Sequence, residues 1–196
     1  MRIILATSNQ GKVREFQSWI SEYEVVAYSD VMDPFEIEET GLTFKENALI
    51  KARAVYEKLS DKNNIVLSDD SGISVPLLGG APGIYSARYA GVGASSNDNL
   101  NKLIATLKEH GVEKTPAFYT AAIALVCTQG AFCVHGWMHG DAIAQARGTN
   151  GFGYDPMFIP CGYDKTLGEL DENVKKAFSH RARALELAHI VLNSLK

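Results

Sequence analysis

A short apolar run that ends in two adjacent carboxylates is the feature that most constrains this fold. Residues 65–67 read Ile-Val-Leu and are typical of a buried strand, and we expect this strand to end at Asp69 and Asp70, which a Ser-Gly turn follows. Open α/β sheets bind ligands outside the carboxyl ends of their strands. We therefore expect the chemistry at this point of the chain.

The two carboxylates are predicted to point to opposite sides, because side chains alternate along an extended chain. One can then anchor the turn while the other faces a cleft. We assign the exposed and catalytic role to Asp70, which is closer to the flexible Gly72. An Asx-type turn with no catalytic role is the alternative interpretation of the same residues.

The N-terminal residues predict an anion site. An apolar strand over residues 2–7 is followed by a polar loop and by a helical pattern that begins at Val13. The free backbone N–H groups and the positive end of the dipole make a helix N-terminus attractive to phosphate, and Lys12 adds a full charge. The loop lacks the glycines of a Walker A or dinucleotide-binding sequence. A generic junction between a loop and a helix is the alternative.

An acidic segment over residues 29–41 contains Glu38 and Glu39. It is either a solvated connection or a source of oxygen ligands for Mg²⁺, which takes one or two carboxylates together with water and phosphate. Thr43 and Glu46 then form a predicted capping box. Lys51 lies on the helix that follows, and it becomes a candidate only if that helix lines the same site.

Two segments near the C-terminus carry groups that suit a nucleoside. Residues 148–156 hold three glycines, two aromatic rings for stacking on a base, and Asp155, whose direction the following proline restricts. An aromatic-rich structural loop is the alternative. Ser179 is a predicted N-cap for the last helix, which places His180 and Arg181 where the helix dipole disfavours cations. That cost indicates an anionic or carbonyl-bearing partner.

The remaining pattern predicts an α/β protein with a strand over residues 24–28, a helix capped by Ser95 or Ser96, and a hairpin of residues 117–127 and 131–138. A length of 196 residues suits one domain, or one domain with a small lobe.

The net charge of −4 argues against binding of duplex nucleic acid, and no apolar run is long enough to span a membrane. The three cysteines show no metal spacing and predict reduced, buried thiols of a cytosolic protein.

Seven motifs, taken together and in order, resemble the inosine triphosphate pyrophosphatase family, also called the dITP/XTP pyrophosphatases. They lie at residues 7–12, 38–47, 51–53, 69–72, 79–83, 151–155 and 179–181. The first motif departs from the family at Ser8, where a glycine is usual. The resemblance implies an elongated mixed β-sheet flanked by helices, with two lobes of a single domain, residues 1–196, around a central nucleotide-binding cleft. It also implies a cytoplasmic homodimer that uses Mg²⁺ to hydrolyse deaminated purine triphosphates.

The resemblance also implies residue roles. It makes Asp70 the general base and a metal ligand, with Glu38 as the second metal carboxylate and Glu39 as its competitor. The substrate contacts that it implies are Thr7, Ser8, Asn9, Gln10, Gly11, Lys12, Lys51 and Ser71 toward the phosphates and Phe152, Gly153, Tyr154, Asp155, Lys175, His180 and Arg181 toward the nucleoside. The expected partner is a small-molecule nucleoside triphosphate.

The reaction expected from these roles is attack of water on the α-phosphorus, with pyrophosphate as the leaving group. No cysteine has a histidine partner in a motif and Ser71 has no evident base, so we do not expect a covalent nucleophile. A pyrophosphatase for modified pyrimidine or other nucleotides is the alternative enzyme. The alternative from another class is a nucleotide-binding sensor without turnover, but carboxylates beside a triphosphate weaken binding unless a metal intervenes.

Overall fold

A computed structural model of the chain describes residues 2–8 and 10–195. It contains a six-stranded sheet in the order β2-β1-β3-β4-β5-β6. Strand β1 runs parallel to both β2 and β3, whereas β5 and β6 are antiparallel, so the sheet is mixed. The strands are β1 (Arg2–Leu5), β2 (Glu24–Ala27), β3 (Ile65–Ser74), β4 (Lys114–Cys127), β5 (Gly130–Ile143) and β6 (Phe158–Pro160). The predicted α/β class, the strand after residue 23 and the hairpin are confirmed.

The α-helices are α1 (Gln10–Trp19), α2 (Phe44–Lys58), α3 (Ser96–Glu109), α4 (Glu172–Lys176) and α5 (His180–Ser194). Short 3₁₀ helices lie at Tyr28–Asp30, Pro76–Leu78, Gly83–Arg88 and Asp155–Met157. The chain divides into two compact units. Unit 1 contains the described residues up to Asp70, residues 121–135 and those from Ala184 onward, and unit 2 contains residues 71–120 and 136–183. That these form the two lobes of one domain stays a prediction.

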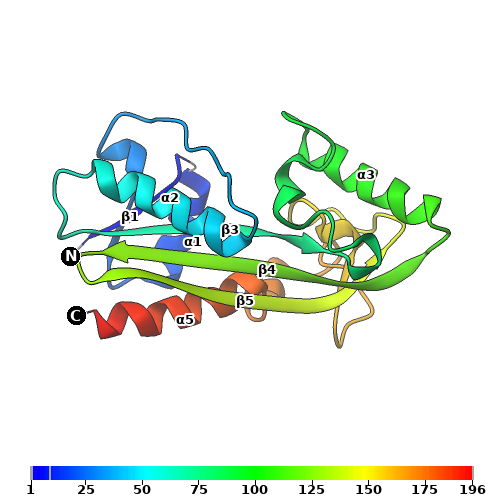
Figure 1. Cartoon of the computed structure of the whole chain (residues 1–196). Helices are drawn as coiled ribbons and strands as arrows, with labels where there is room; N and C mark the ends of the chain where they lie inside the picture. The colour runs from blue at the N-terminus through cyan, green and yellow to red at the C-terminus, as the bar shows by residue number, and fades with distance from the viewer. Residues whose placement is uncertain (1, 9, 196) are drawn as a thin grey trace. The chain divides into compact units, whose positions relative to one another are not determined.

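Unit 1 has helices on both faces of its part of the sheet. Alternate strand residues pack in opposite directions, as the period of two requires. Ile3 and Leu67 share an apolar cluster with α1 and α5, while Ile4 and Val66 share another with α2. Figure 1 shows α2 and α5 on opposite sides of the strands. Side chains of β3 therefore reach α1 or α2 according to whether their position is odd or even.

Unit 2 has its own core, in which Leu100, Leu103 and Leu107 of α3 pack with Ile73 of β3. The N-cap of α3 is Ser95, whose hydroxyl accepts a hydrogen bond from the Asp98 amide at 3.1 Å. Thr43 caps α2 in the same manner, with the Glu46 amide as its donor at 3.1 Å. The predicted capping box of Thr43 and Glu46 is confirmed, and of the two serines predicted as alternative caps for the next helix the structure shows Ser95.

Replacement of the α3 cap tests this part of the fold. The Ser95→Ala variant is expected to lower the free energy of unfolding by about 1 kcal/mol, because the amide of Asp98 loses its acceptor. Urea denaturation measures the change. Ser96→Ala, one residue further along the same helix, is the matched control and should stay within about 0.5 kcal/mol of the parent. Equal effects of the two substitutions would contradict the assignment of the cap.

Strand β3 does not end where the sequence predicted. It is ten residues long and ends at Ser74, so the Ser-Gly turn expected after Asp70 is wrong. Gly72 lies inside the strand, and a Cβ atom there would stand 2.3 Å from the Ser86 hydroxyl and 2.6 Å from the Gly83 carbonyl oxygen. The Ile73 amide also donates to that hydroxyl at 3.0 Å. The glycine therefore permits a close approach of chain segments rather than a turn.

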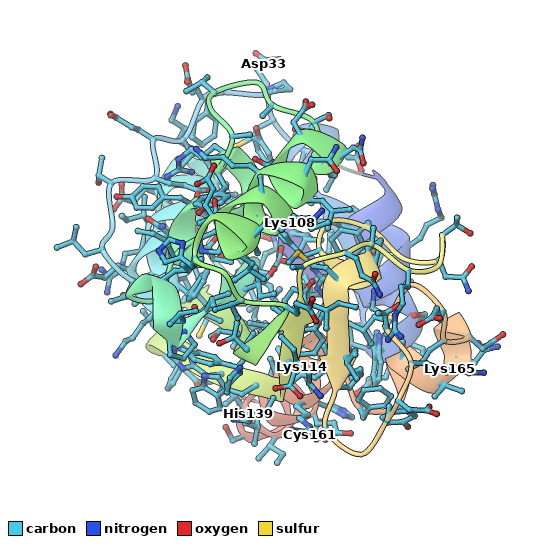
Figure 2. All side chains as sticks on the ribbon, turned by 90° about the vertical axis from the view of Figure 1, so that its right-hand side faces the viewer. Asp33, Lys108, Lys114, His139, Cys161 and Lys165 are labelled. Atoms are coloured by element: carbon cyan, nitrogen blue, oxygen red, sulfur yellow. The ribbon has the colours of Figure 1, made fainter. Side chains whose placement is uncertain are left out.

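The cysteines are all free thiols, but the prediction that they are buried is wrong. Cys127 and Cys133 are half-buried and Cys161 is exposed. Figure 2 shows Cys161 beside His139, and the Cys161 amide donates to the His139 carbonyl at 3.0 Å. Over residues 2–8 and 10–195, none of the helices has the length and hydropathy needed to cross a membrane.

Candidate active site

The two adjacent carboxylates of β3 point to opposite faces of the sheet, which confirms the prediction from alternation. Asp69 accepts hydrogen bonds from the Lys12 ammonium of α1 at 3.0 and 3.3 Å. Asp70 accepts one from the Lys51 ammonium of α2 at 3.1 Å. Strand β3 extends beyond the last residue of β1, so both carboxylates lie past the carboxyl end of β1. The two carboxylates therefore lie at the kind of edge where α/β sheets bind ligands, although β3 itself continues past them.

Lys51 joins two carboxylates of unit 1. Its ammonium lies 3.0 Å from Glu39 and 3.1 Å from Asp70, and the Lys51 and Asp70 side chains are only 14% and 13% exposed. Burial lowers the pKa of Lys51, but the negative charges of the three nearby carboxylates outweigh it, so the pKa is raised and the ammonium stays protonated. Lys51 thus meets the condition set from the sequence, since its helix brings it into contact with Asp70, and its part in substrate binding stays a prediction.

Asp70 has an environment that suits a general base. Burial raises the pKa of its carboxyl above the ordinary value, Lys51 opposes this shift, and the charges of Glu39 and Asp69 reinforce it. A carboxylate with a raised pKa is a stronger proton acceptor. Asp69 is less suited to this role, because its side chain is 5% exposed, against 13% for Asp70.

The acidic cluster also fits a hard divalent cation. Oδ2 of Asp70 is buried and accepts no hydrogen bond from the described residues. Within residues 2–8 and 10–195 there is no group of three or more His, Cys, Asp or Glu side chains that could form a complete metal cage. Mg²⁺ does not need such a cage, since it binds through one or two carboxylates with water and phosphate. The donor set therefore fits Mg²⁺ better than a structural metal.

The structure distinguishes the two adjacent glutamates of the acidic segment. Glu39 faces Lys51 and Asp70, whereas Glu38, the sequence-based choice for the second metal ligand, has an exposed side chain. The Gly41 amide donates to the buried Asn47 side chain at 2.8 Å, which holds this segment against α2. The geometry thus places the carboxylate of Glu39 beside the carboxylate of Asp70.

The order of strand, loop and helix predicted at the N-terminus is confirmed, but β1 ends at Leu5 and α1 already begins at Gln10, so Lys12 lies in the helix and not in the predicted loop. Thr7 is half-buried and Ser8 is exposed in the connection between them. Gln10 and Gly11 form the first residues of α1, and Asn9 lies outside the described residues. The Lys12 side chain is 37% exposed while its ammonium pairs with Asp69. It can therefore remain in this ion pair and still face an anion at the start of α1.

The residues predicted at the nucleoside end form a second cluster, within unit 2. Asp155 accepts hydrogen bonds from the Phe152 amide at 2.9 Å and from the Lys175 ammonium. The ring of Phe152 is 62% exposed, with the Lys175 ammonium 5.0 Å and the Arg181 guanidinium carbon 5.8 Å from its centroid. His180 and Arg181 are 7% and 8% exposed. An aromatic face and several hydrogen-bond donors are thus gathered in one place.

The N-terminus of α5 also agrees with the sequence. The Ala182 amide donates to the Ser179 hydroxyl at 3.1 Å, so Ser179 is a cap as predicted. This cap fixes the backbone from which His180 and Arg181 project.

Other members of the predicted set have structural surroundings. The Tyr154 hydroxyl donates to the Ser86 carbonyl at 2.8 Å and the side chain is 5% exposed, so its ring faces the core of unit 2 rather than a ligand. Asp155 is buried, and its hydrogen bonds hold neighbouring site residues in place. Gly153 is half-buried in the same loop, and Ser71 follows Asp70 in β3. Of the two aromatic residues predicted to stack on a base, only Phe152 is exposed.

Sequence reasoning missed Tyr119, which reaches two members of the nucleoside cluster. Its ring stacks on the His180 imidazole with 4.7 Å between centroids and 12° between planes, and its hydroxyl donates to Asp155 at 3.4 Å. The only general rule that applies to Tyr119 is that the hydroxyl of a buried tyrosine needs a hydrogen-bond partner. The partner could not be identified, because Asp155 is 36 residues away in sequence.

A separate pocket in unit 2 contains none of the predicted site residues. It has a volume of about 700 Å³ and lies between the end of α3 and the end of β5, with Lys108 and Lys114 of Figure 2 in its lining. Lys114 is paired with Asp141 at 3.0 Å, and Arg147 lies 3.4 Å from Glu169. Carboxylates therefore neutralise two of its cations.

The fold is α/β, and its two clusters gather paired carboxylates and lysines in unit 1 and an exposed aromatic side chain with several hydrogen-bond donors in unit 2. The chain belongs to the Ham1 family, whose model it matches over residues 3–189. It is 62% identical to the dITP/XTP pyrophosphatase of Nautilia profundicola, over 100% of this chain and 99% of that one. It is 60% identical to the enzyme of the same name from Sulfurimonas denitrificans, over 100% of both chains.

Solved structures agree with this assignment. The Ham1 protein of Staphylococcus aureus has a TM-score of 0.90 to this chain at 36% identity, with 100% of both chains covered. The nucleoside-triphosphatase, dITP/XTP pyrophosphatase, of Mycobacterium abscessus has a TM-score of 0.79 at 36% identity, with 96% of this chain and 98% of that one covered. The family recognised from the seven sequence motifs is confirmed.

Proposed function

We propose that this protein hydrolyses deaminated purine nucleoside triphosphates, ITP, dITP and XTP, to the monophosphate and pyrophosphate, and so removes them from the nucleotide pool. Relatives that share 52–62% of its residues over nearly the whole chain carry the name dITP/XTP pyrophosphatase. The observation in the structure that carries the proposal is the pair of buried carboxylates on opposite faces of β3, each with its own lysine. This arrangement supplies a proton acceptor and cations for a polyphosphate in one unit.

The phosphate end of the substrate binds unit 1 in this proposal. The start of α1 contributes backbone N–H groups and the Lys12 ammonium, and Lys51 adds a second cation. Residues 7–12 thus hold the triphosphate. Ser71, which follows Asp70 along β3 and is the first residue of unit 2, is a further substrate contact. The charge of a triphosphate requires such cations, because otherwise the acidic side chains would repel it.

The chemical step needs one proton transfer, one new bond from oxygen to the α-phosphorus and one broken bond. A water molecule attacks the α-phosphorus, Asp70 accepts the proton that the water loses, and the bond between the α-phosphorus and the bridging oxygen breaks. Pyrophosphate then leaves. Mg²⁺, when bound by Asp70 and one of the two glutamates, supplies positive charge for the phosphate oxygens. No covalent intermediate is required.

The nucleoside end binds the cluster in unit 2. The exposed ring of Phe152 offers a stacking face for the purine. Lys175, His180 and Arg181 supply hydrogen-bond donors toward the carbonyl oxygens of hypoxanthine or xanthine. Asp155 and Gly153 maintain the loop that presents Phe152, and Gly151 is needed because a Cβ there would stand 2.1 Å from an Asp155 carboxylate oxygen.

A panel of nucleoside triphosphates incubated with the protein and Mg²⁺ tests the proposed function. We expect pyrophosphate and not orthophosphate as the product, with ITP, dITP and XTP as the best substrates. Faster turnover of modified pyrimidine triphosphates would favour the alternative enzyme. Tight binding of ITP without any product would favour a nucleotide sensor and contradict the proposal.

Neutral variants of the two glutamates test the metal site. We propose Asp70 and one residue of the Glu38–Glu39 pair as the Mg²⁺ ligands, and the position of Glu39 beside Lys51 supports Glu39. Glu39→Gln is expected to raise the Mg²⁺ concentration needed for half-maximal activity by about tenfold, while Glu38→Gln changes it less. Removal of Mg²⁺ with a chelator should abolish turnover. A larger increase in the required Mg²⁺ concentration for Glu38→Gln than for Glu39→Gln would identify Glu38 as the ligand.

We further propose a cytoplasmic homodimer. The free thiols of Cys127, Cys133 and Cys161 support a reducing compartment. The dimer rests on the family resemblance, and the exposed Trp137 of β5 offers apolar contact surface for it. Light scattering at micromolar concentration is expected to give twice the chain mass of 21.3 kDa. A monomer mass would contradict this part of the proposal.

A further inference from the structure

Tyr119 lies where β4 reaches the nucleoside cluster of unit 2. Its side chain is 6% exposed and belongs to the core of that unit, where its ring meets the edge of Phe158 with 4.9 Å between centroids and 69° between planes. The same ring is also stacked on the imidazole of His180. A buried side chain with two such ring contacts has little rotational freedom.

The stack on Tyr119 limits the orientation of the His180 imidazole. The centroids lie 4.7 Å apart and the ring planes differ by 12°. The backbone of His180 is already fixed, because Ser179 caps α5 through the Ala182 amide. With both backbone and ring plane constrained, the ring nitrogens of His180 point in defined directions.

The hydroxyl of Tyr119 connects this stack to the rest of the cluster. It donates to Oδ1 of Asp155 at 3.4 Å, while Oδ2 of Asp155 accepts from the Phe152 amide and the Lys175 ammonium. Burial raises the pKa of Tyr119 well above its ordinary value, and the charge of Asp155 adds to the shift, so the hydroxyl remains protonated and can donate. One side chain thus contacts both His180 and the carboxylate that holds Lys175.

We propose that Tyr119 is a positioning residue for base recognition, which orients the imidazole of His180 by stacking and the carboxylate of Asp155 by a hydrogen bond. This inference rests on the proposed function and deepens it. Tyr119 does not touch the base in this proposal. It fixes the donors of His180 and Lys175 relative to each other, so that they match the oxygen at the six position of a deaminated purine and not an amino group.

Two substitutions separate the stack from the hydrogen bond. Tyr119→Leu removes the aromatic face and is expected to lower kcat/KM for ITP by about 5- to 10-fold, mainly through KM, and to lower the ratio of ITP to ATP turnover. Tyr119→Phe keeps the stack and loses only the hydroxyl, so we expect a loss of about two- to threefold. Thermal unfolding of each variant shows whether its fold is retained.

The matched control is Phe118→Leu on the same strand. Phe118 points away from Tyr119 and packs on His139, with 5.7 Å between ring centroids, outside both clusters. This variant also loses an aromatic contact to a histidine, but it should leave the ratio of ITP to ATP turnover unchanged. An equal change in that ratio for Phe118→Leu and Tyr119→Leu would mean that Tyr119 only supports the fold.

Binding and spectroscopic readouts keep this test independent of turnover. Calorimetry with IMP and with pyrophosphate, used separately, should show weaker IMP binding to Tyr119→Leu and unchanged pyrophosphate binding. NMR spectra of the histidine rings should show a shifted His180 signal in Tyr119→Leu, and a smaller shift in Tyr119→Phe. Unchanged IMP affinity and an unchanged His180 signal in Tyr119→Leu overturn the inference. Absence of ITP hydrolysis by the parent protein overturns the proposed function instead.

Discussion

The Asp70→Asn variant is expected to lose about 10²- to 10⁴-fold in kcat for ITP, because an amide cannot accept the proton of the attacking water. Asparagine matches aspartate in shape, so the variant should fold and bind substrate. Calorimetry with ITP and steady-state kinetics with Mg²⁺ measure the two properties separately. Loss of a metal ligand adds to the effect, since Oδ2 of Asp70 has no hydrogen-bond partner among the described residues.

Asp69→Asn is the matched control for Asp70→Asn. The two residues are adjacent in β3, but Asp69 faces Lys12 across 3.0 Å and its side chain is 5% exposed. We expect a much smaller loss of turnover and a decrease of about 1 kcal/mol in the free energy of unfolding, a modest value because Lys12 is partly exposed to solvent. Abolished turnover in a folded Asp69→Asn protein, together with an active Asp70→Asn protein, would reverse the roles of the two carboxylates.

The second large effect concerns the choice of base. ITP and XTP carry an acceptor oxygen at the six position, whereas ATP carries an amino donor. Lys175 and Arg181 can donate hydrogen bonds and cannot accept them. His180 and Arg181 are 7% and 8% exposed, so water compensates poorly for an unmatched group. Each unmatched buried group costs about 1–3 kcal/mol, and ATP is therefore expected to fall about 10- to 100-fold or more below ITP in kcat/KM.

GTP shares the six-position oxygen, so these donors do not exclude it. That GTP is also a poor substrate follows from the family resemblance. The measurement is kcat/KM for ITP, XTP, GTP and ATP, repeated with Arg181→Ala, which should lose more activity toward ITP than toward ATP. Arg183→Ala is the control, because that exposed arginine lies on the same helix and donates to the Trp137 carbonyl at 2.7 Å. If Arg181→Ala lowers kcat/KM for ITP and for ATP by the same factor, Arg181 binds both nucleotides equally and does not discriminate between the bases.

Patterns among residues close in the sequence predicted the directions of strand side chains and the helix caps. The side-chain period of two along β3 placed Asp69 and Asp70 on opposite faces, and the structure provides Lys12 and Lys51 as their partners. Capping rules identified Thr43 and limited the other cap to Ser95 or Ser96, because a cap is a contact between residues three positions apart. Such features depend on residues that are close together in the sequence.

Features set by long-range packing could not be predicted in the same way. The continuation of β3 through Gly72 depends on Ser86, and the role of Tyr119 depends on His180 and Asp155. The distinction between Glu38 and Glu39 likewise depends on which of them faces Lys51. In each of these cases the sequence supplied the residue type, and only the packed chain supplied its partner.

Hydrolysis of ITP in ¹⁸O-labelled water tests the central claim most directly. If water attacks the α-phosphorus with Asp70 as the base, mass spectrometry should find one labelled oxygen in IMP and none in pyrophosphate. Asp70→Asn should slow formation of this labelled product without changing where the label appears. Label in pyrophosphate, or orthophosphate as the first product, would contradict the account.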